Sequence, residues 1–257
     1  MPIISTAGLA RTFPGKNGPV EAVRGIDLTV RPGEILGLLG PNGAGKTTTL
    51  RMLTTLLPPT GGAATVAGHD LVKDPAAVRR RIGYVAQSGG LDPQETVRSE
   101  LVLQGRLYGL DRTRATARAE ELAVDLHLTE LLDRPTPALS GGQRRRLDLA
   151  MGLTHRPEIL FLDEPTTGLD PGSRADLWAL VRRLRDEYGT TVVLTTHYLD
   201  EADALADRLV IVDEGTVVAE GSPAALKAAH GAATLQDAFL AITGRGPAPV
   251  DTTPVAV

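Results

Sequence analysis

Short apolar runs and amphipathic stretches alternate along most of this chain. The runs are dominated by apolar residues and lie at 35–39, 159–162, 191–196 and 209–212. Two longer stretches, 97–132 and 176–188, instead place their leucines and valines at helical spacing. Continuous apolar runs of this length are typical of buried parallel strands. Strands that alternate with helices predict an α/β fold with a largely parallel sheet.

Three regions depart from this alternation. Near the N-terminus, residues 3–5 and 22–30 have strand-like patterns and are joined by a polar loop that contains Phe13. Phe13 is interpreted either as folded back on the core or as a platform for a nucleotide base. No strand pattern interrupts 97–132, which predicts an all-helical insertion between strands. The composition of 244–257, rich in Gly, Pro, Ala and Thr, predicts a disordered tail.

Composition limits the classes of function. The 257 residues are 42% hydrophobic and 23% charged, as in ordinary globular proteins. A formal net charge of −4 indicates no nucleic-acid-binding surface, and the absence of cysteine excludes disulfides and thiolate chemistry. No signal peptide is visible, and no stretch approaches the roughly 20 consecutive apolar residues of a membrane helix.

A glycine-rich segment joins the first apolar run to a helical pattern, and its sequence is Gly40-Pro41-Asn42-Gly43-Ala44-Gly45-Lys46-Thr47-Thr48. A strand, a glycine-rich loop and a helix in this order form a phosphate-binding loop. The glycines let several backbone N–H groups point at one anion, and the helix N-terminus adds its positive dipole end. Lys46 would reach the β- and γ-phosphates, and the Thr47 hydroxyl would bind Mg²⁺. The segment therefore predicts binding of a nucleoside triphosphate.

Further polar residues stand where other predicted strands end. Ligands of open α/β sheets bind at the carboxyl ends of the strands, where we expect Gln87, Asp163-Glu164 and His197 to meet the phosphate loop. Asp163 suits a Mg²⁺ contact, while Glu164 can orient or deprotonate the attacking water. The Gln87 amide can contact both Mg²⁺ and water. His197 can donate a hydrogen bond to the γ-phosphate.

A second anion site is predicted at Leu139-Ser140-Gly141-Gly142-Gln143. Ser140 is a good N-cap for a helix that runs to Leu153, and the two glycines leave backbone N–H groups for an anion. Because the phosphate loop already provides one such helix, we expect this second set of donors to serve another nucleotide.

These motifs together resemble the nucleotide-binding subunits of ATP-binding cassette (ABC) transporters, over about residues 3–225. Gly40 to Thr47 matches the Walker A motif, Leu139 to Gln143 the family signature, and 159–163 with Glu164 the Walker B motif and the catalytic glutamate. Gln87 falls at the Q-loop, Thr167-Gly168-Leu169-Asp170 at the D-loop, and His197 at the switch histidine. Phe13 falls at the adenine-stacking aromatic, which is more often a tyrosine in this family.

The resemblance implies a P-loop NTPase fold with a mostly parallel core, an antiparallel β subdomain and an inserted helical subdomain at about 91–150. A nucleotide-binding domain would span 1–225, with a helical extension at 226–243 in which Leu235, Phe239, Leu240 and Ile242 pack on the main domain. ATP and Mg²⁺ are implied, with Glu164, His197 and Gln87 catalytic and Thr47, Gln87 and Asp163 as metal ligands. Other ATP contacts would come from two copies of the chain in a head-to-tail dimer that sandwiches two nucleotides: Phe13, Gly40, Asn42, Gly43, Gly45, Lys46, Thr47, Thr48, Ser140, Gly141, Gly142, Gln143 and Asp170.

The segments 90–110, 195–203 and 234–240 are similar to drug-resistance exporters of the daunorubicin type. In that group the ATPase and the permease are separate chains, which implies a peripheral protein on the cytoplasmic face of the membrane. An importer subunit remains an alternative, because it would use the same chemistry. A non-transport ABC ATPase is disfavoured, because such proteins carry coiled coils or tandem cassettes.

Overall fold

The computed structural model describes residues 1–16 and 18–244, and its strands form two sheets. The smaller sheet is antiparallel with the order β2-β1-β4-β5. Its strands are β1 (Ile4–Phe13), β2 (Val20–Val30), β4 (Gly61–Val66) and β5 (His69–Asp70). The larger sheet has the order β10-β9-β3-β8-β7-β6 and is parallel except for β10 at its edge. Its strands are β3 (Ile35–Leu39), β6 (Ile82–Val85), β7 (Ile159–Asp163), β8 (Thr191–Thr196), β9 (Arg208–Asp213) and β10 (Thr216–Gly221).

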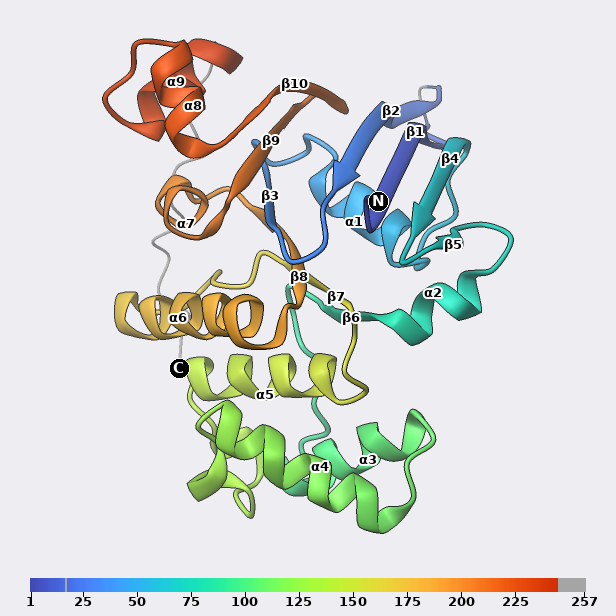
Figure 1. The fold of residues 1–257 in the computed structure, drawn as a ribbon, viewed down its shortest axis with the longest axis vertical. Coiled ribbons are helices and arrows are strands. Elements are labelled where there is room, and N and C mark those ends of the chain that lie inside the picture. The colour runs from blue at the N-terminus through green and yellow to red at the C-terminus, as the bar shows by residue number, and fades with distance from the viewer. Residues whose placement is uncertain (17, 245–257) are drawn as a thin grey trace.

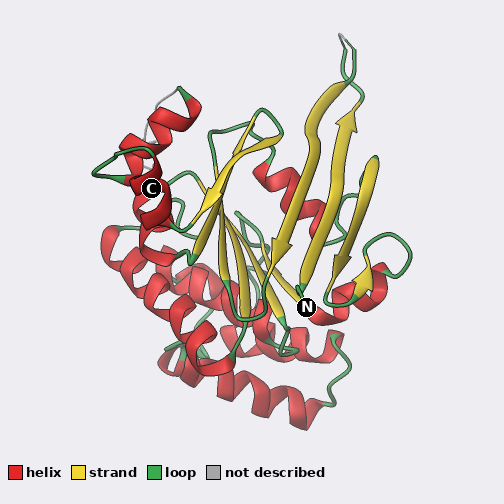
Figure 2. Ribbon diagram, turned by 45° about the horizontal axis from the view of Figure 1, so that its top comes forward, coloured by secondary structure: helices red, strands yellow, loops and turns green. Residues whose placement is uncertain are grey.

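Helices surround the larger sheet, and Figure 2 shows them in red beside the two yellow sheets. They are α1 (Lys46–Leu53), α2 (Pro75–Arg81), α3 (Val97–Leu107), α4 (Arg112–Asp125), α5 (Gly141–Leu153), α6 (Pro171–Tyr188), α7 (Leu199–Leu205), α8 (Pro223–Ala229) and α9 (Leu235–Thr243). Helices α3, α4 and α5 gather at one end of the molecule, and α8 and α9 lie at the other (Figure 1).

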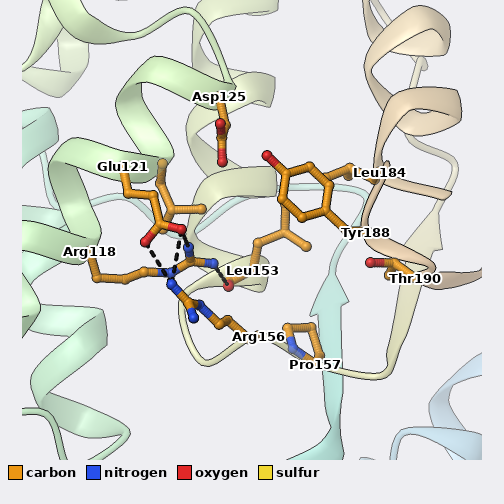
Figure 3. A pocket seen from close by; sticks show the side chains of 10 residues that line it. Arg118, Glu121, Asp125, Leu153, Arg156, Pro157, Leu184, Tyr188 and Thr190 are labelled. Atoms are coloured by element: carbon orange, nitrogen blue, oxygen red, sulfur yellow. Dashed lines mark hydrogen bonds and ion pairs between the residues drawn. The ribbon is translucent and has the colours of Figure 1, made fainter. Parts of the chain in front are cut away.

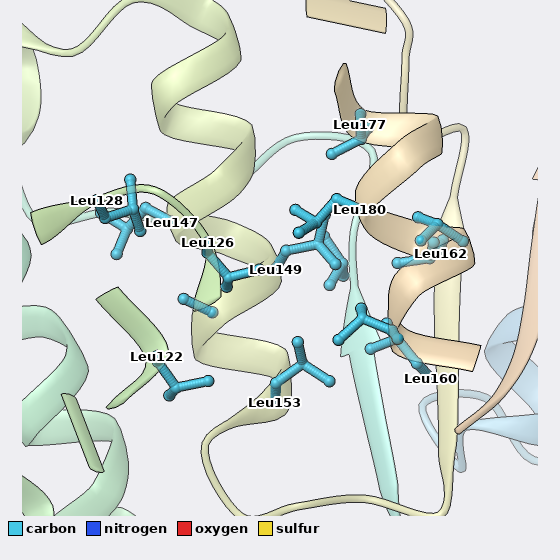
Figure 4. Packing of buried hydrophobic residues seen from close by; sticks show 14 of the residues in the cluster. Leu122, Leu126, Leu128, Leu147, Leu149, Leu153, Leu160, Leu162, Leu177 and Leu180 are labelled. Atoms are coloured by element: carbon cyan, nitrogen blue, oxygen red, sulfur yellow. The ribbon is translucent and has the colours of Figure 1, made fainter. Parts of the chain in front are cut away.

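The parallel strands are buried on both faces, which explains their continuous apolar sequences. In β7, Leu160 and Leu162 enter one apolar cluster, whereas Ile159 and Phe161 enter another. The first cluster packs the sheet against α5 and α6 and continues into the helical region through Leu122 and Leu126 (Figure 4). The second lies around α1, between the two sheets. Both clusters hold the carboxyl ends of the central strands in fixed positions.

Most predicted elements are present, with three corrections. The strand β1 pairs with β2 as far as Phe13 and Val20. Phe13 therefore ends a strand and does not lie in the predicted loop. Leu240 is 38% exposed, so it was wrong to place it with Leu235 and Phe239 in the buried contact of α9. Helix α7, directly after the switch-histidine position, was not predicted.

Two expectations concern the ends of the chain and the membrane. The predicted disordered tail lies outside the described residues apart from Gly244, whose φ of 66° places it in the left-handed region at the end of α9. Among the helices of 1–16 and 18–244, none combines the length and the hydrophobicity that crossing a membrane requires.

Candidate functional site

The phosphate loop turns from β3 into α1 at two glycines that no other residue could replace without a clash. A Cβ on Gly40 would lie 2.1 Å from the backbone oxygen of Val212. A Cβ on Gly45 would lie 2.5 Å from that of Ala22, and the Gly45 φ of 101° is in the left-handed region. These contacts fit the loop closely against β2 and β9, so that α1 begins at Lys46 with its N-terminus at the sheet edge.

Lys46 is a buried ammonium group at the centre of this loop. Its side chain folds back so that Nζ donates to the backbone oxygens of Gly40 at 2.8 Å and Pro41 at 3.0 Å. Burial lowers the pKa of Lys46, and the negative charges of Glu164 and Asp163 oppose that effect. A cation held among backbone oxygens, with no carboxylate in direct contact in the described structure, is suited to an incoming phosphate.

Asp163, at the end of β7, accepts hydrogen bonds from three neighbouring elements. The Thr47 hydroxyl donates to Oδ1 at 2.9 Å, and the Thr195 hydroxyl of β8 donates to the same atom at 2.7 Å. The Tyr84 hydroxyl of β6 lies 3.4 Å from Oδ2. A carboxylate and a threonine hydroxyl in contact form the oxygen donor set that Mg²⁺ prefers. No group of three or more His, Cys, Asp or Glu side chains within 1–16 and 18–244 could form a metal site without other ligands.

Glu164 follows Asp163 and is surrounded by polar partners. Gln87 Nε2 donates to Oε2 at 2.9 Å, the Thr167 hydroxyl donates to the same oxygen at 3.3 Å, and His197 Nδ1 lies 3.2 Å from Oε1. The close contact with His197 is the largest influence on the pKa of Glu164, which is lowered although burial acts in the opposite direction. The carboxyl group is therefore ionised at neutral pH, as a base must be.

The backbone of Glu164 is unusual, because its φ of 44° lies in the left-handed region. Its N–H donates to the Thr195 hydroxyl at 3.0 Å, which ties the turn to β8. Such a conformation costs free energy and persists where surrounding contacts impose it, often at functional sites.

The signature segment lies at the exposed start of α5. Ser140 Oγ accepts from the Gln143 N–H at 3.3 Å, and Gln143 Oε1 accepts from the Ser140 N–H at 3.0 Å, which completes a capping box. The segment packs on the start of α6, where a Cβ on Gly142 would lie 2.6 Å from Ser173 Oγ. Asp170 caps α6 by accepting from the Ser173 hydroxyl and N–H, contacts that lower the pKa of Asp170.

The sequence-predicted site residues thus form two groups. The described contacts join Thr47 to Asp163 and Gln87 and His197 to Glu164, beside Lys46. Within the described chain, no hydrogen bond or ion pair links the signature residues Ser140 to Gln143 with Gly40 to Thr48. Phe13 stands apart from both groups at the end of β1, with the Arg11 guanidinium 4.7 Å from the centre of its ring.

Sequence reasoning gave no contact in the site to three residues that complete it: Thr195, Tyr84 and Thr167, the last of which it placed only in the D-loop. Thr195 lies inside an apolar run and is fully buried, so its pattern is that of a core residue. Tyr84 lies inside β6 and reaches Asp163 from a neighbouring strand. The only signal for Tyr84 in the sequence was its position on a predicted strand, three residues before Gln87.

A cavity of about 310 Å³ lies away from this edge, where α4 meets the ends of α5 and α6 (Figure 3). Pro157 and Thr190, which line it, precede β7 and β8, so it lies toward the amino ends of these strands. Three of its charged groups are paired with one another, since Glu121 lies 2.8 Å from Arg118 and 2.9 Å from Arg156. The cavity is therefore separate from the candidate site at the carboxyl ends of the strands.

Comparisons with known proteins agree with this geometry. A family model described as ABC transporter matches residues 23–167. The daunorubicin/doxorubicin resistance ATP-binding protein DrrA of Streptomyces peucetius is 50% identical over 233 residues, which are 91% of this chain and 69% of that protein. The Nod factor export ATP-binding protein I of Paraburkholderia xenovorans is 43% identical over 213 residues, 83% of this chain and 70% of that protein. The chain thus spans about two thirds of the length of these relatives.

Solved structures resemble the whole fold. A dimeric ATP-binding cassette in a post-hydrolysis state, bound to ADP and Pi, superimposes with a TM-score of 0.78 at 26% identity. The alignment covers 85% of this chain and 98% of that one. An ATP-binding subunit of an ABC transporter gives a TM-score of 0.81 at 26% identity, covering 94% of this chain and 99% of that one.

Proposed function

The chain belongs to the ABC transporter family, and we propose that it is the ATP-hydrolysing subunit of an exporter for a drug, an antibiotic or a similar hydrophobic compound. The family identity makes it an ATPase. Its relatives are named for drug resistance and for export, which supports export over import. The observation that carries the proposal is the meeting of Lys46, Thr47, Asp163, Glu164 and His197 at the carboxyl ends of β3, β7 and β8.

For binding, we propose that Lys46 leaves the carbonyl groups of Gly40 and Pro41 and pairs with the β- and γ-phosphates. Asn42, Gly43, Gly45 and Thr48 would line the same loop, and Phe13 would stack on the adenine. Thr47 and Asp163 would hold Mg²⁺, with Gln87 adjacent to them, since these oxygens are already in contact or within the same polar cluster. When bound, Mg²⁺ neutralises charge on the phosphate oxygens.

For hydrolysis, we propose Glu164 as the general base. Its carboxylate is ionised, and the hydrogen bond from Gln87 and the 3.2 Å contact with His197 Nδ1 hold it in place. A water between Glu164 and the γ-phosphate would pass a proton to the carboxylate as its oxygen attacks phosphorus. The bond between the γ-phosphorus and the β,γ-bridging oxygen would break, and ADP would leave with that oxygen. His197 would then donate to the γ-phosphate and stabilise the charge that develops there.

For assembly, we propose an ATP-dependent, head-to-tail dimer in which Ser140, Gly141, Gly142 and Gln143 contact the partner's nucleotide and Asp170 lies at the interface. The separation of the two site groups within one chain and the dimeric form of a similar cassette support this arrangement. A separately encoded permease would bind the dimer at the cytoplasmic face of the membrane and supply the selectivity for the exported compound.

The first test is the mass in solution of the full chain carrying Glu164→Gln, with and without Mg·ATP. A shift from monomer to dimer that requires ATP is expected, because binding is retained while hydrolysis stops. The matched control is Glu164→Gln combined with Lys46→Ala, which should remain monomeric. A mass that ignores ATP, both alone and with a co-expressed permease, would contradict the sandwich.

A further inference from the structure

One buried arginine of the signature helix contacts the backbone of both catalytic loops. Arg145, in α5, is only 6% exposed. Its Nε donates to the Pro165 oxygen at 2.8 Å and its Nη2 to the Asp163 oxygen at 3.2 Å. Its Nη1 donates to the Ala86 oxygen at 2.6 Å. The first two acceptors flank Glu164, and the third directly precedes Gln87.

These three bonds act where the backbone needs external support. Glu164 adopts the left-handed φ of 44°, which a non-glycine residue keeps only when its surroundings impose it. The carbonyl groups on either side of Glu164 are both held by the same planar guanidinium. A planar guanidinium donates several hydrogen bonds in fixed directions and so holds several acceptors at once, which the single ammonium group of lysine cannot do.

Asp148, one turn further along α5, supplies the opposite charge. Its Oδ2 lies 3.7 Å from Arg145 Nη1, and both side chains are nearly buried. The loop after Gln87 passes directly over it, because a Cβ on Gly89 would lie 2.4 Å from Asp148 Oδ1. Burial raises the pKa of Asp148 and lowers that of Arg145, while each charge favours the ionised form of the other. The pair therefore lies beneath the Gln87 loop and beside the Glu164 turn.

We propose that Arg145 is a positioning residue for hydrolysis, which fixes Glu164 and Gln87 relative to the signature helix. The inference rests on the proposed function, because it takes Glu164 as the base. Since α5 begins at the signature segment, a movement of this helix on contact with the partner's nucleotide would be passed to the chain's own catalytic turn. Arg145 would thus join the two half-sites of the dimer through one side chain.

The neighbouring arginines provide controls. Arg144 is exposed, and Arg146 is paired with Asp176 at 2.7 Å. We would compare full-length Arg145→Gln, Arg145→Lys, the double variant Arg145→Gln/Asp148→Asn and the control Arg144→Gln. The double variant removes both charges, so it leaves no unpaired buried charge of the kind that Arg145→Gln leaves on Asp148.

Three quantities are measured for each variant: kcat, KM for ATP, and amide hydrogen exchange of 86–90 and 163–168. We expect all three Arg145 variants to lower kcat by about 10- to 100-fold, since small misplacements of catalytic groups cost this much. KM should change less than about threefold, because the phosphate loop is untouched. Exchange should accelerate in both segments but not in 46–53. Arg144→Gln should match the unmodified chain in every measurement.

Thermal unfolding separates positioning from stability. Arg145→Gln should lower the midpoint temperature of unfolding, and the double variant should regain most of that decrease while kcat stays low. If kcat recovers together with stability, or if Arg145→Lys has full activity, Arg145 is only half of a core ion pair and the proposal is wrong. If the unmodified chain hydrolyses no ATP, the proposed function fails instead, and the exchange of 86–90 and 163–168 still decides whether Arg145 holds the two loops.

Discussion

Two helices of this molecule have glycine-flanked N-termini at which we propose that phosphate binds, and the two N-termini are built in opposite ways. At α1 the N-cap is Gly45, which provides no side-chain cap, and the first residue is the buried Lys46. At α5 the N-cap is Ser140, which forms a complete capping box with Gln143 at the protein surface. Helix N-termini favour anions in both cases, but only α1 combines uncapped donors with a cation.

The difference indicates what each site requires. The α1 site lacks a cap of its own and holds an ammonium group, so it can bind a phosphate within a single chain. At the α5 site, part of the backbone N–H groups are already hydrogen-bonded within the capping box, and the site is exposed. Its binding of an anion would therefore gain most when a second molecular surface covers it. We therefore expect nucleotide binding to depend on α1, dimerisation to depend on both helices, and hydrolysis to depend on Glu164 between them.

The largest effect is expected from Glu164→Gln. The amide cannot accept a proton, so kcat should fall by about 100- to 10,000-fold, as for loss of a general base. ATP affinity should stay within about threefold, since both helix N-termini are unchanged. Single-turnover hydrolysis together with calorimetric ATP binding measures the two quantities. Glu158→Gln is the matched control, because Glu158 pairs with Arg81 outside the site. Substantial residual turnover would show that another group is the base.

The next effect, on binding itself, is expected from Lys46→Ala. Removing a buried cation that faces phosphate should cost about 2–5 kcal/mol, or about 30-fold or more in ATP affinity. Calorimetric titration with ATP measures it. Lys73→Ala is the control, because that ammonium side chain is 86% exposed and pairs with Asp70 on the surface. Unchanged ATP affinity in the Lys46 variant would show that the phosphate does not bind at the N-terminus of α1.

A smaller effect, on dimerisation and not on ATP binding within one chain, is expected from Ser140→Ala. The change removes the cap of α5 and should destabilise the fold by about 1 kcal/mol. Ser222→Ala provides the matched control, because Ser222 caps α8 in the same way by accepting from the Ala225 N–H at 3.1 Å. In the Glu164→Gln background, we expect Ser140→Ala to weaken the ATP-dependent dimer about tenfold, as measured by light scattering against concentration. Equal effects of the two serine variants would mean that only cap stability is involved.

The same contrast explains how much could be predicted from the sequence. The phosphate loop, the capped signature helix and the buried strands are each encoded within about ten consecutive residues, so local patterns suffice. The contacts that complete the catalytic edge are not local. Thr195 bonds to Asp163 from 32 residues away, and Arg145 bonds to Ala86 from 59 residues away. Arg145 also lies between two other arginines, and no local pattern singles it out as the buried one.

The smallest effect expected is a change in pH dependence at Glu164. The close contact with His197 lowers the pKa of this carboxyl group, while burial raises it. In His197→Ala the effect of burial is no longer opposed by this contact, so the pKa of Glu164 rises. The base must be ionised, and the acid limb of kcat should therefore move to higher pH, starting from a wild-type limb below the ordinary glutamate pKa of 4.5.

The shape of the pH profile, not its height, tests this prediction. His197→Ala also removes the proposed donor to the γ-phosphate, so its rate should be lower at every pH. His197→Gln is the control, because it can still donate to Glu164 and should keep more of the wild-type acid limb. If the acid limb of His197→Ala superimposes on that of the wild type after scaling, the remaining partners Gln87, Lys46 and Thr167 keep Glu164 ionised. His197, which follows β8, would then position Glu164 without changing its pKa.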